Sequence, residues 1–270
     1  MAGVTRVTGV RVYDVGQGDA VALLDQDEAP FLQIDYGGRQ GNPFAVRGAQ
    51  RIDKTMPVRP GSLLVLTHWD EDHWFSARRG GAARQATWLV PRQLTSPRAV
   101  MFSADLDEIY CVPEKWVGNA KCFVASNGDA FWWEKIGSAP RPPASHEDCN
   151  LTGLACSIVR AEDKSVILLP GDAPLHAVGH YKQYLGGAHL LRGLVAFHHG
   201  SKSDWNRTTR HLLRGFAARS PTFDIAFSCA NPNPYNHPHI RNYLEAAPRA
   251  TAHVTANLRS VGRSSIDILF

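Results

Sequence analysis

The sequence predicts an α/β protein folded as a four-layer sandwich, in which two β-rich halves pack together and helices cover them on the outside. Short apolar runs alternate with glycine-containing turns in the first half, and this pattern resumes from Leu151. In both halves several runs end at an aspartate or a histidine. The chain has 270 residues, of which 44% are hydrophobic, so we expect one core and a single domain over residues 1–270.

The first half is expected to contain strands at residues 8–14, 20–24, 31–34 and 62–66. The glycines of VGQGDA and DYGG suit tight turns that present Asp14, Asp19 and Asp35 at strand ends. Residues 92–149 show few clear periods and are rich in proline, tryptophan and charge. We expect a variable insertion there that faces the substrate and contains a helix over residues 103–109.

The second half is expected to alternate strands with helices. Strands are predicted at residues 154–160, 164–169, 191–197, 222–230 and 261–270. Helices are predicted at residues 174–185 and 208–218. Because the two halves carry similar patterns, we expect two sheets with helices on their outer faces.

The composition narrows the class of protein. Five cysteines without a CxxC pair argue against a disulfide framework and against a zinc ribbon, and they suit a reducing cytoplasm. The chain start lacks a basic leader followed by an apolar region, and the apolar runs are far shorter than the roughly 20 residues of a membrane span. We therefore expect a cytoplasmic protein with no membrane partner. The formal charge of +4 mildly favours anionic partners.

A dense cluster of metal-ligand side chains follows the apolar run SLLVL. The motif THWDEDH contains His68, Asp70, Asp72 and His73. Asp172 follows a second apolar run, and His198 with His199 follows a third. Imidazole nitrogens mixed with carboxylate oxygens suit zinc, manganese or iron better than calcium, which prefers oxygen alone. The repeated position at a strand end predicts a metal site, whereas any one of these residues alone would fit a core histidine or a loop cap.

These motifs resemble a known family. THWDEDH is similar to the HxDxDH version of the HxHxDH signature of the metallo-β-lactamase superfamily, IDYGG resembles its early aspartate motif, and LLPGDA resembles its bridging-aspartate motif. DVGQGDA, FHHGSKS and NPYNHPH are similar to the soluble hydrolase domain of the ComEC competence proteins and their stand-alone relatives. The motifs occur in the family order along most of the chain.

The resemblance implies an αββα sandwich, the metallo-β-lactamase fold, with two divalent ions, zinc or manganese, in a cleft between the sheets. It implies that His68 and Asp70 hold the first ion and that Asp72 and His73 hold the second. Asp172 would bridge the two ions. His199 would complete the second ion's ligands, with His198 as the alternative, and Asp35 would orient the metal loop from behind.

Two positions depart from the family pattern. Asn150 stands where many members have a histidine, so the first site is expected to be weak unless His146 reaches it. Trp74 follows His73 where the family has small glycines, and we expect its indole to line the cleft and contact the substrate.

Further candidates surround the predicted centre. His237 in NPYNHPH is a candidate proton donor to the leaving group, and Asn236 and His239 are candidate substrate contacts. A structural turn built on prolines is the alternative. Ser201 and Lys202 after HHG would bind a phosphate oxygen, or form an ordinary polar loop. Arginines 207, 210 and 214 recur at roughly helical spacing and would follow a phosphate backbone, or form a solvated helix face.

The sequence predicts a metal-dependent hydrolase that cleaves a phosphate-containing substrate, such as DNA, RNA or a nucleotide, through a metal-activated water. Asp72 and His237 are the candidate catalytic residues. One alternative is a metal-dependent hydrolase of a non-nucleotide ester, lactone or amide. Another is a non-catalytic accessory module that keeps the fold and binds partner proteins of a multi-gene system.

Overall fold

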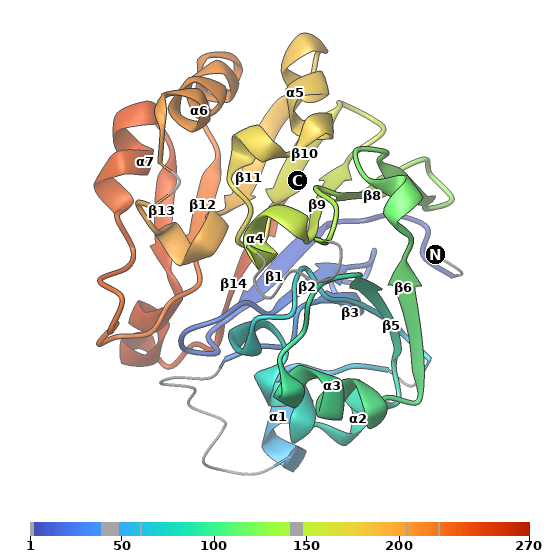
Figure 1. Cartoon of the computed structure of the whole chain (residues 1–270). Helices are drawn as coiled ribbons and strands as arrows, with labels where there is room; N and C mark the ends of the chain where they lie inside the picture. Colours follow the sequence, from blue (N-terminus) through green and yellow to red (C-terminus); the bar gives the residue numbers. More distant parts are fainter. Residues whose placement is uncertain (1–2, 39–48, 60, 141–147, 204, 221) are drawn as a thin grey trace.

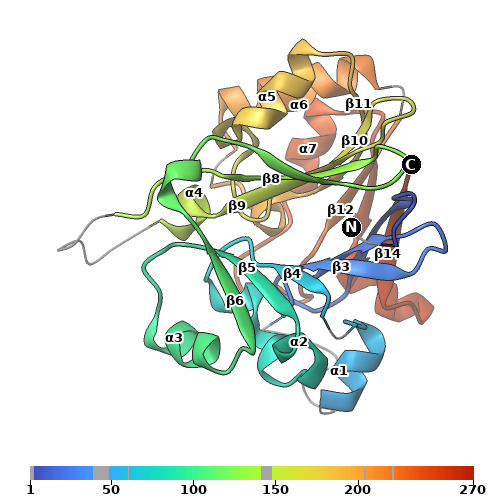
Figure 2. The same cartoon turned by 90° about the vertical axis from the view of Figure 1, so that its right-hand side faces the viewer.

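The computed structural model describes residues 3–38, 49–59, 61–140, 148–203, 205–220 and 222–270. Two seven-stranded sheets face each other, and helices cover the outer face of each sheet (Figures 1 and 2). The predicted α/β four-layer sandwich is therefore confirmed. In the described part of the chain, no helix has the length and apolar character that a bilayer crossing requires.

The first sheet has the strand order β14-β1-β2-β3-β4-β5-β6. Antiparallel pairs join its strands from β14 to β3, and parallel pairs join those from β3 to β6. Its strands are β1 (Gly9–Tyr13), β2 (Val21–Leu24), β3 (Pro30–Ile34), β4 (Leu63–Val65), β5 (Thr87–Pro91), β6 (Glu108–Val112) and β14 (Ser265–Leu269).

The second sheet has the order β13-β12-β11-β10-β9-β8-β7. Parallel pairs join its strands from β13 to β10, and antiparallel pairs join those from β10 to β7. Its strands are β7 (Lys121–Val124), β8 (Ala130–Lys135), β9 (Leu154–Val159), β10 (Ser165–Leu169), β11 (Leu190–Val195), β12 (Asp224–Phe227) and β13 (Thr251–Val254). Each sheet thus has an antiparallel half and a parallel half.

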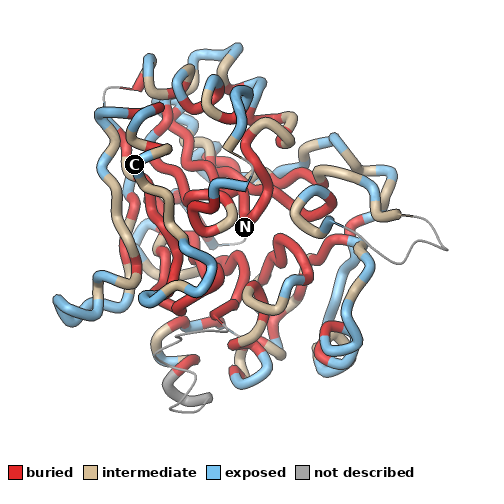
Figure 3. The backbone as a smooth tube through the Cα atoms, turned by 60° about the vertical axis from the view of Figure 1, so that its left-hand side comes forward, coloured by how far each residue is buried: buried red, intermediate tan, exposed pale blue. Residues whose placement is uncertain are grey.

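Helices lie outside both sheets (Figure 2). The first sheet carries α1 (Ala49–Thr55), α2 (Gly81–Arg84) and α3 (Pro97–Ala104). The second carries α5 (Gly179–Gly186), α6 (Arg207–Arg219) and α7 (Ile240–Ala246). The short helix α4 (Cys149–Thr152) precedes β9. Figure 3 shows that the buried backbone is concentrated in the middle of the molecule, with the exposed segments around it.

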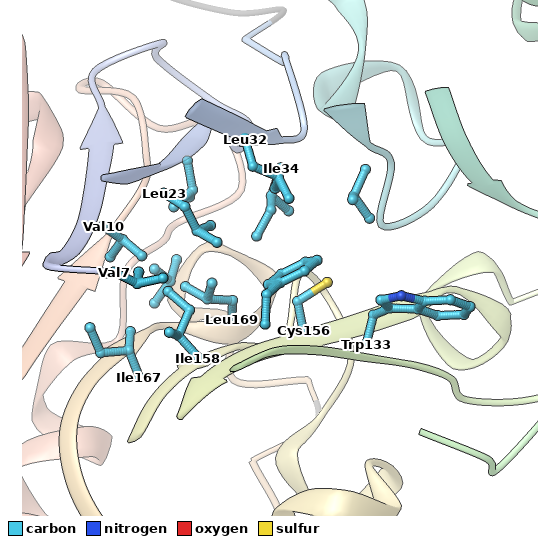
Figure 4. Close-up of a cluster of buried hydrophobic side chains, with 14 of the residues drawn as sticks. Val7, Val10, Leu23, Leu32, Ile34, Trp133, Cys156, Ile158, Ile167 and Leu169 are labelled. Carbon is cyan, nitrogen blue, oxygen red and sulfur yellow. The ribbon is translucent and has the colours of Figure 1, made fainter. Parts of the chain in front are cut away.

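The main core fills the space between the sheets. Figure 4 shows Leu23 and Ile34 of the first sheet pointing toward Ile158 and Leu169 of the second. Alternate residues of a strand point to opposite faces, so the other face of each sheet is free to pack against helices. Burying one such side chain fully stabilises the fold by about 1.5–3 kcal/mol. This packing fixes the relative position of the strand ends that carry the polar motifs.

The helix predicted over residues 103–109 is wrong. The structure has a helix that begins earlier, at Pro97, where the Ser96 side chain accepts a hydrogen bond from the Ala99 backbone amide. This helix ends at Ala104, and Glu108–Val112 forms β6 on the edge of the first sheet. Local helix propensity was overridden there by pairing with β5.

The segment expected as a variable insertion, residues 92–149, contributes to both sheets. It supplies β6 to the first sheet and β7 and β8 to the second. Residues 141–147, including His146, lie outside the described residues. The strands of this segment therefore extend the sandwich itself.

A buried polar network holds α5 on the second sheet. Glu134 of β8 accepts hydrogen bonds from the backbone amides of Gly179 and His180 and from Nδ1 of His180, at 3.0, 2.9 and 2.7 Å. Nε2 of the same imidazole lies 3.2 Å from Oγ of Ser157. Burial by itself would raise the pKa of Glu134, but the hydrogen bonds from His180 outweigh it and lower the pKa.

We expect Glu134→Gln to lower the free energy of unfolding at pH 7 by about 2 kcal/mol, because it replaces charge-assisted hydrogen bonds with neutral ones. A lowered pKa stabilises the fold above the ordinary value of 4.5, and this stabilisation is lost as the pH falls below it. The gap between wild type and variant in urea denaturation should therefore shrink as the pH is lowered below 4.5.

Glu245→Gln is the matched control, because Glu245 is exposed and pairs with Arg241 one helical turn away. Its expected effect is about 0.5 kcal/mol at most. Equal losses for the two variants would contradict a stabilising role of the Glu134 network.

Candidate metal centre

The polar motifs meet at the ends of strands from both sheets. His68 and His73 follow β4, Asp172 follows β10, and His199 follows β11. All four side chains are buried, with 0 to 4% of their surface exposed. Asp72 also reaches the cluster, with its Oδ2 3.3 Å from Nε2 of His199. Residues that are far apart in sequence thus form one compact group.

The carboxylate of Asp172 lies at the centre of this group. Its Oδ1 lies 3.3 Å from Nε2 of His73 and 3.5 Å from Nε2 of His199. Its Oδ2 lies 3.7 Å from Nε2 of His68 and 3.8 Å from Nε2 of His198. Each oxygen therefore faces its own pair of histidines, which is the arrangement expected of a carboxylate between two cations.

One further carboxylate lies beside each of the two pairs of histidines. Oδ2 of Asp70 lies 3.4 Å from Nε2 of His68, and Asp72 lies beside His199. The structure thus brings together all the residues predicted as metal ligands. His198 and His199 both take part, on opposite sides of Asp172.

Several of the candidate ligand atoms lie close together but form no hydrogen bonds within the described part of the chain. Nε2 of His68, His73 and His199 and Oδ1 of Asp172 are buried, and none forms a hydrogen bond of normal geometry with a described residue. Leaving such a buried atom unsatisfied costs about 1–3 kcal/mol. Three-residue sets, such as Asp72 with His73 and His199, bring ligand atoms within 4.8 Å of one another. Two ligands of a tetrahedral zinc ion, each about 2.1 Å from it, are about 3.4 Å apart. The residues present therefore fit divalent metal ions.

The electrostatics of the cluster also suit cations. Burial alone would raise the pKa of Asp172, but His199 and His73 lower it well below the ordinary value. Burial would also raise the pKa of Asp72, and contact with His199 lowers it. Burial would lower the pKa of His199, and Asp172 and Asp19 raise it well above the ordinary value. The carboxylates therefore stay ionised, and positive charge must accompany them.

Asp35 fixes the orientation of His73. Its carboxylate accepts hydrogen bonds from the backbone amide and hydroxyl of Thr67, both at 2.7 Å, and lies 2.8 Å from Nδ1 of His73. These contacts leave Nε2 of the ring facing Asp172. Asp35 is fully buried and adopts a left-handed backbone conformation, with φ 53°. Such strain is typical of functional sites.

Asp19 is a site residue that the sequence identified only as a strand-end aspartate. Its Oδ1 is buried and lies 3.5 Å from Nδ1 of His199, as Asp35 lies beside His73. Asp19 is not spaced from a neighbouring histidine or carboxylate as metal ligands in a motif are, so the sequence did not predict its contact with His199. The sequence feature that could have indicated a site role is its position in VGQGDA, between a glycine turn and a strand.

Two glycines pack directly against the backbone of the loop that carries Asp72. A Cβ on Gly18 would lie 2.1 Å from the backbone oxygen of Asp72, and one on Gly37 would lie 1.7 Å from it. That oxygen accepts a hydrogen bond of 2.9 Å from the backbone amide of Gly38. The glycines are required because three loops approach each other at backbone distance.

We expect Gly37→Ala to displace the Asp72 loop, lower the metal content, and reduce the free energy of unfolding by about 1–3 kcal/mol. Metal analysis and denaturation measure the two effects. Gly186→Ala is the control, because its Cβ would meet no atom within 4 Å and it lies in α5. It should leave metal content unchanged, and a Gly37→Ala protein with full metal content would contradict the close packing.

Asn150 lies beside one of the histidines. Its Nδ2 lies 3.5 Å from Nδ1 of His198. The sequence suggested that Asn150 leaves the first position short of a ligand. In the structure Nε2 of His198 faces Asp172 on that side, at 3.8 Å from Oδ2.

His237 lies next to His198, with ring centroids 5.7 Å apart. Burial, together with His199 and His198, lowers the pKa of His237 to about 4. Its imidazole is therefore neutral at pH 7 and can donate one N–H hydrogen bond. His239 is half-buried, 6.3 Å from His237 between ring centroids, and Asn236 is exposed.

The residues after the HHG motif differ in accessibility. Ser201 is buried, and its hydroxyl lies 2.7 Å from that of Ser203. Lys202 is exposed on the loop that leads to α6. Of the two predicted phosphate contacts, Lys202 is therefore the accessible one.

The expectation that Trp74 contacts the substrate is corrected by the structure. Its side chain is fully buried and stacks on Phe102, with ring centroids 4.7 Å apart. Its Nε1 donates a hydrogen bond of 3.0 Å to the backbone oxygen of Trp69. The indole thus supports the metal loop from the core of the first sheet, because the short turn after His73 directs it inward.

The sequence matches no protein-family model and no curated protein. The structure resembles that of Tm1679, a metal-dependent hydrolase of the β-lactamase superfamily, with a TM-score of 0.51 and 11% identity over 91% of this chain and 95% of that one. It also resembles the metallo-β-lactamase fold protein YhfI from Bacillus subtilis, with a TM-score of 0.47 and 11% identity over 91% and 95% of the two chains. The likeness to Tm1679 and the two facing seven-stranded sheets show that the chain has the metallo-β-lactamase fold, as its motifs predicted.

Proposed function

We propose that this chain, which has the metallo-β-lactamase fold, is a metal-dependent hydrolase that cleaves phosphodiesters of nucleic acids or nucleotides. The observation that supports the hydrolase most strongly is Asp172, whose two oxygens face two separate pairs of histidines. The buried, unpartnered nitrogens around it have no structural use without a cation.

In this proposal His68, Asp70 and His198 would hold one divalent ion. Asp72, His73 and His199 would hold the other, and the carboxylate of Asp172 would serve both. A bound zinc or manganese ion acts as a Lewis acid that lowers the pKa of water and stabilises negative charge on phosphate oxygens.

The surrounding residues position this centre and its substrate. Asp35 and Asp19 hold the rings of His73 and His199 from behind. His237 lies at the His198 side and would donate a hydrogen bond to the leaving oxygen. Lys202, exposed next to the histidine motif, would contact a phosphate oxygen.

The preference for phosphodiesters is supported by the similarity of DVGQGDA, FHHGSKS and NPYNHPH to the ComEC-like hydrolase domains and by the net charge of +4. The test is a substrate panel. Protein stripped by a chelator and reloaded with zinc or manganese is assayed on bis(p-nitrophenyl) phosphate, single-stranded DNA and RNA, and on lactone, thioester and amide substrates.

We expect phosphodiester cleavage that disappears with the chelator and returns with metal. Cleavage of acyl substrates alone would support the alternative ester, lactone or amide hydrolase. Absence of all activity, with well under one equivalent of metal per chain, would support the non-catalytic binding module.

A further inference from the structure

A hollow of about 760 Å³ lies along α6, lined by the first two turns of this helix and by Trp205. Residues 201–203 follow the 3-10 helix that carries His199, and Trp205 at the edge of the hollow comes two residues later. α6 lies on the outer face of the second sheet, between α5 and α7 (Figure 1). The hollow is therefore beside the metal centre and is formed by different residues.

The exposed side of α6 carries only positive charge. Arg207, Arg210 and Arg214 recur at positions i, i+3 and i+7, so they form one stripe, and all three line the hollow. The helix sequence RTTRHLLRGFAAR contains no aspartate or glutamate. Within the described residues, none of the three arginines forms a salt bridge. Like charges at this spacing destabilise a helix, and an anionic partner would relieve the repulsion among these three arginines.

Two hydrogen-bond donors of residues that line the hollow are unused. Nε of Arg210 and Nε1 of Trp205 are buried, and neither has a hydrogen-bond partner among the described residues. Both atoms can only donate. Asn206 also lines the hollow, but its side-chain oxygen already accepts a hydrogen bond of 2.9 Å from the Thr209 amide. The lining therefore favours a ligand rich in acceptor oxygens.

Packing holds this stripe in a fixed relation to the metal centre. The opposite side of α6 buries Leu212, Leu213 and Phe216. Trp205 packs on Phe197, the residue before His198, with ring centroids 6.1 Å apart and planes inclined by 11°. This packing connects the residues that line the hollow to the histidine motif.

The direction of α6 points its stripe away from the metal centre. The helix follows β11 and precedes β12, and these two strands are parallel. It must therefore run back along the sheet, with Arg207 at the metal end and Arg214 about 10 Å farther along the axis. A linear polyanion bound at the metal centre could continue along this row.

We propose that Arg207, Arg210 and Arg214 bind the phosphodiester backbone of a nucleic acid strand that extends from the metal centre. Guanidinium groups pair with phosphate oxygens through two parallel hydrogen bonds, and a row of three suits successive phosphates. This inference rests on the proposed function, which it deepens by making the substrate a polynucleotide strand longer than a nucleotide.

Binding without cleavage tests the α6 stripe separately from catalysis. The chelator-treated full chain is titrated into a fluorescein-labelled single-stranded 12-nucleotide DNA, and anisotropy is recorded at several salt concentrations. The variant is the triple substitution R207Q, R210Q and R214Q. The control is R6Q, R241Q and R263Q, which removes the same charge from exposed arginines elsewhere. Thermal unfolding verifies that both proteins fold.

We expect the dissociation constant of the α6 variant to rise at least about 10-fold and its salt slope to fall by about 2, because three phosphate contacts with a single strand are lost. The control should bind like wild type. Equal binding by the α6 variant and wild type would overturn the inference. So would a polyglutamate peptide or inorganic phosphate that binds the same arginines as tightly as DNA, since the face would then be a general anion site.

The metal-loaded enzyme gives the second readout. The α6 variant should raise KM for the oligonucleotide and leave the hydrolysis of bis(p-nitrophenyl) phosphate unchanged. If wild type cleaves neither substrate but loses DNA binding with the α6 variant, the proposed function fails and the binding face stands. If both substrates are cleaved equally by variant and wild type, the binding face fails and the proposed function stands.

Discussion

Asp172→Asn should reduce metal-dependent phosphodiester hydrolysis on the order of 10³-fold, the size of effect seen when one preorganised electrostatic group is removed. One oxygen of Asp172 faces His73 and His199, and the other faces His68 and His198. Asparagine keeps the shape but presents an uncharged amide, one end of which donates hydrogen bonds. One of the two histidine pairs would therefore face a group that cannot bind a cation.

The measurements for this variant are metal content per chain and kcat/KM on bis(p-nitrophenyl) phosphate. Asp105→Asn is the control, because Asp105 is exposed at the end of α3 and far in sequence from every metal motif. It should match wild type in both measurements. An Asp172→Asn protein with full metal content and near-normal kcat/KM would show that this carboxylate does not lie between the ions.

Asp35→Asn is expected to weaken metal binding by about 10–100-fold, the usual result of losing a carboxylate that orients a histidine ligand. Asp35 accepts two hydrogen bonds from Thr67 and contacts Nδ1 of His73. An amide cannot satisfy all three donors, so the ring of His73 is free to rotate or to change tautomer.

Competition with a fluorescent chelator measures this loss of affinity, and the same titration with Asp105→Asn is the control. Denaturation of the metal-free proteins separates affinity from folding. Burial raises the pKa of Asp35 despite the contact with His73, so the charge of this carboxylate is itself costly in the folded protein. Unchanged metal affinity in a folded Asp35→Asn protein would show that Asp35 has no orienting role.

The sequence predicted the fold well where apolar runs were bounded by turns. The strands expected at residues 20–24 and 31–34 occur as Val21–Leu24 and Pro30–Ile34. The helix expected at residues 208–218 occurs as Arg207–Arg219. One error lies in residues 103–109, where the edge strand β6 has four consecutive exposed residues and so shows no alternation that would mark it as a strand.

The candidate site was predictable where ligands share a motif. THWDEDH supplied closely spaced candidates, whereas Asp19 contacts the cluster only because two distant loops meet. The prediction for Trp74 was wrong because the sequence shows only that a bulky residue follows His73. It does not show whether the backbone directs that side chain toward the cleft or toward the core. The contact between His198 and Asn150 likewise joins residues that are far apart in the sequence, so the sequence alone could not predict it. The nuclease activity, the native metal and the cytoplasmic location stay predictions.

The strand β14 pairs with β1 in the first sheet, although the strand before it, β13, belongs to the second. Five residues of each strand are in register, and Arg11 and Asp267 join the two by hydrogen bonds of 2.8 and 2.7 Å. During synthesis on the ribosome, the outer side of β1 therefore stays without its neighbour until residues 265–269 emerge. An unpaired strand edge recruits strands from other molecules. The edge of β1 is thus open to pairing with strands of other molecules until residues 265–269 have been synthesised.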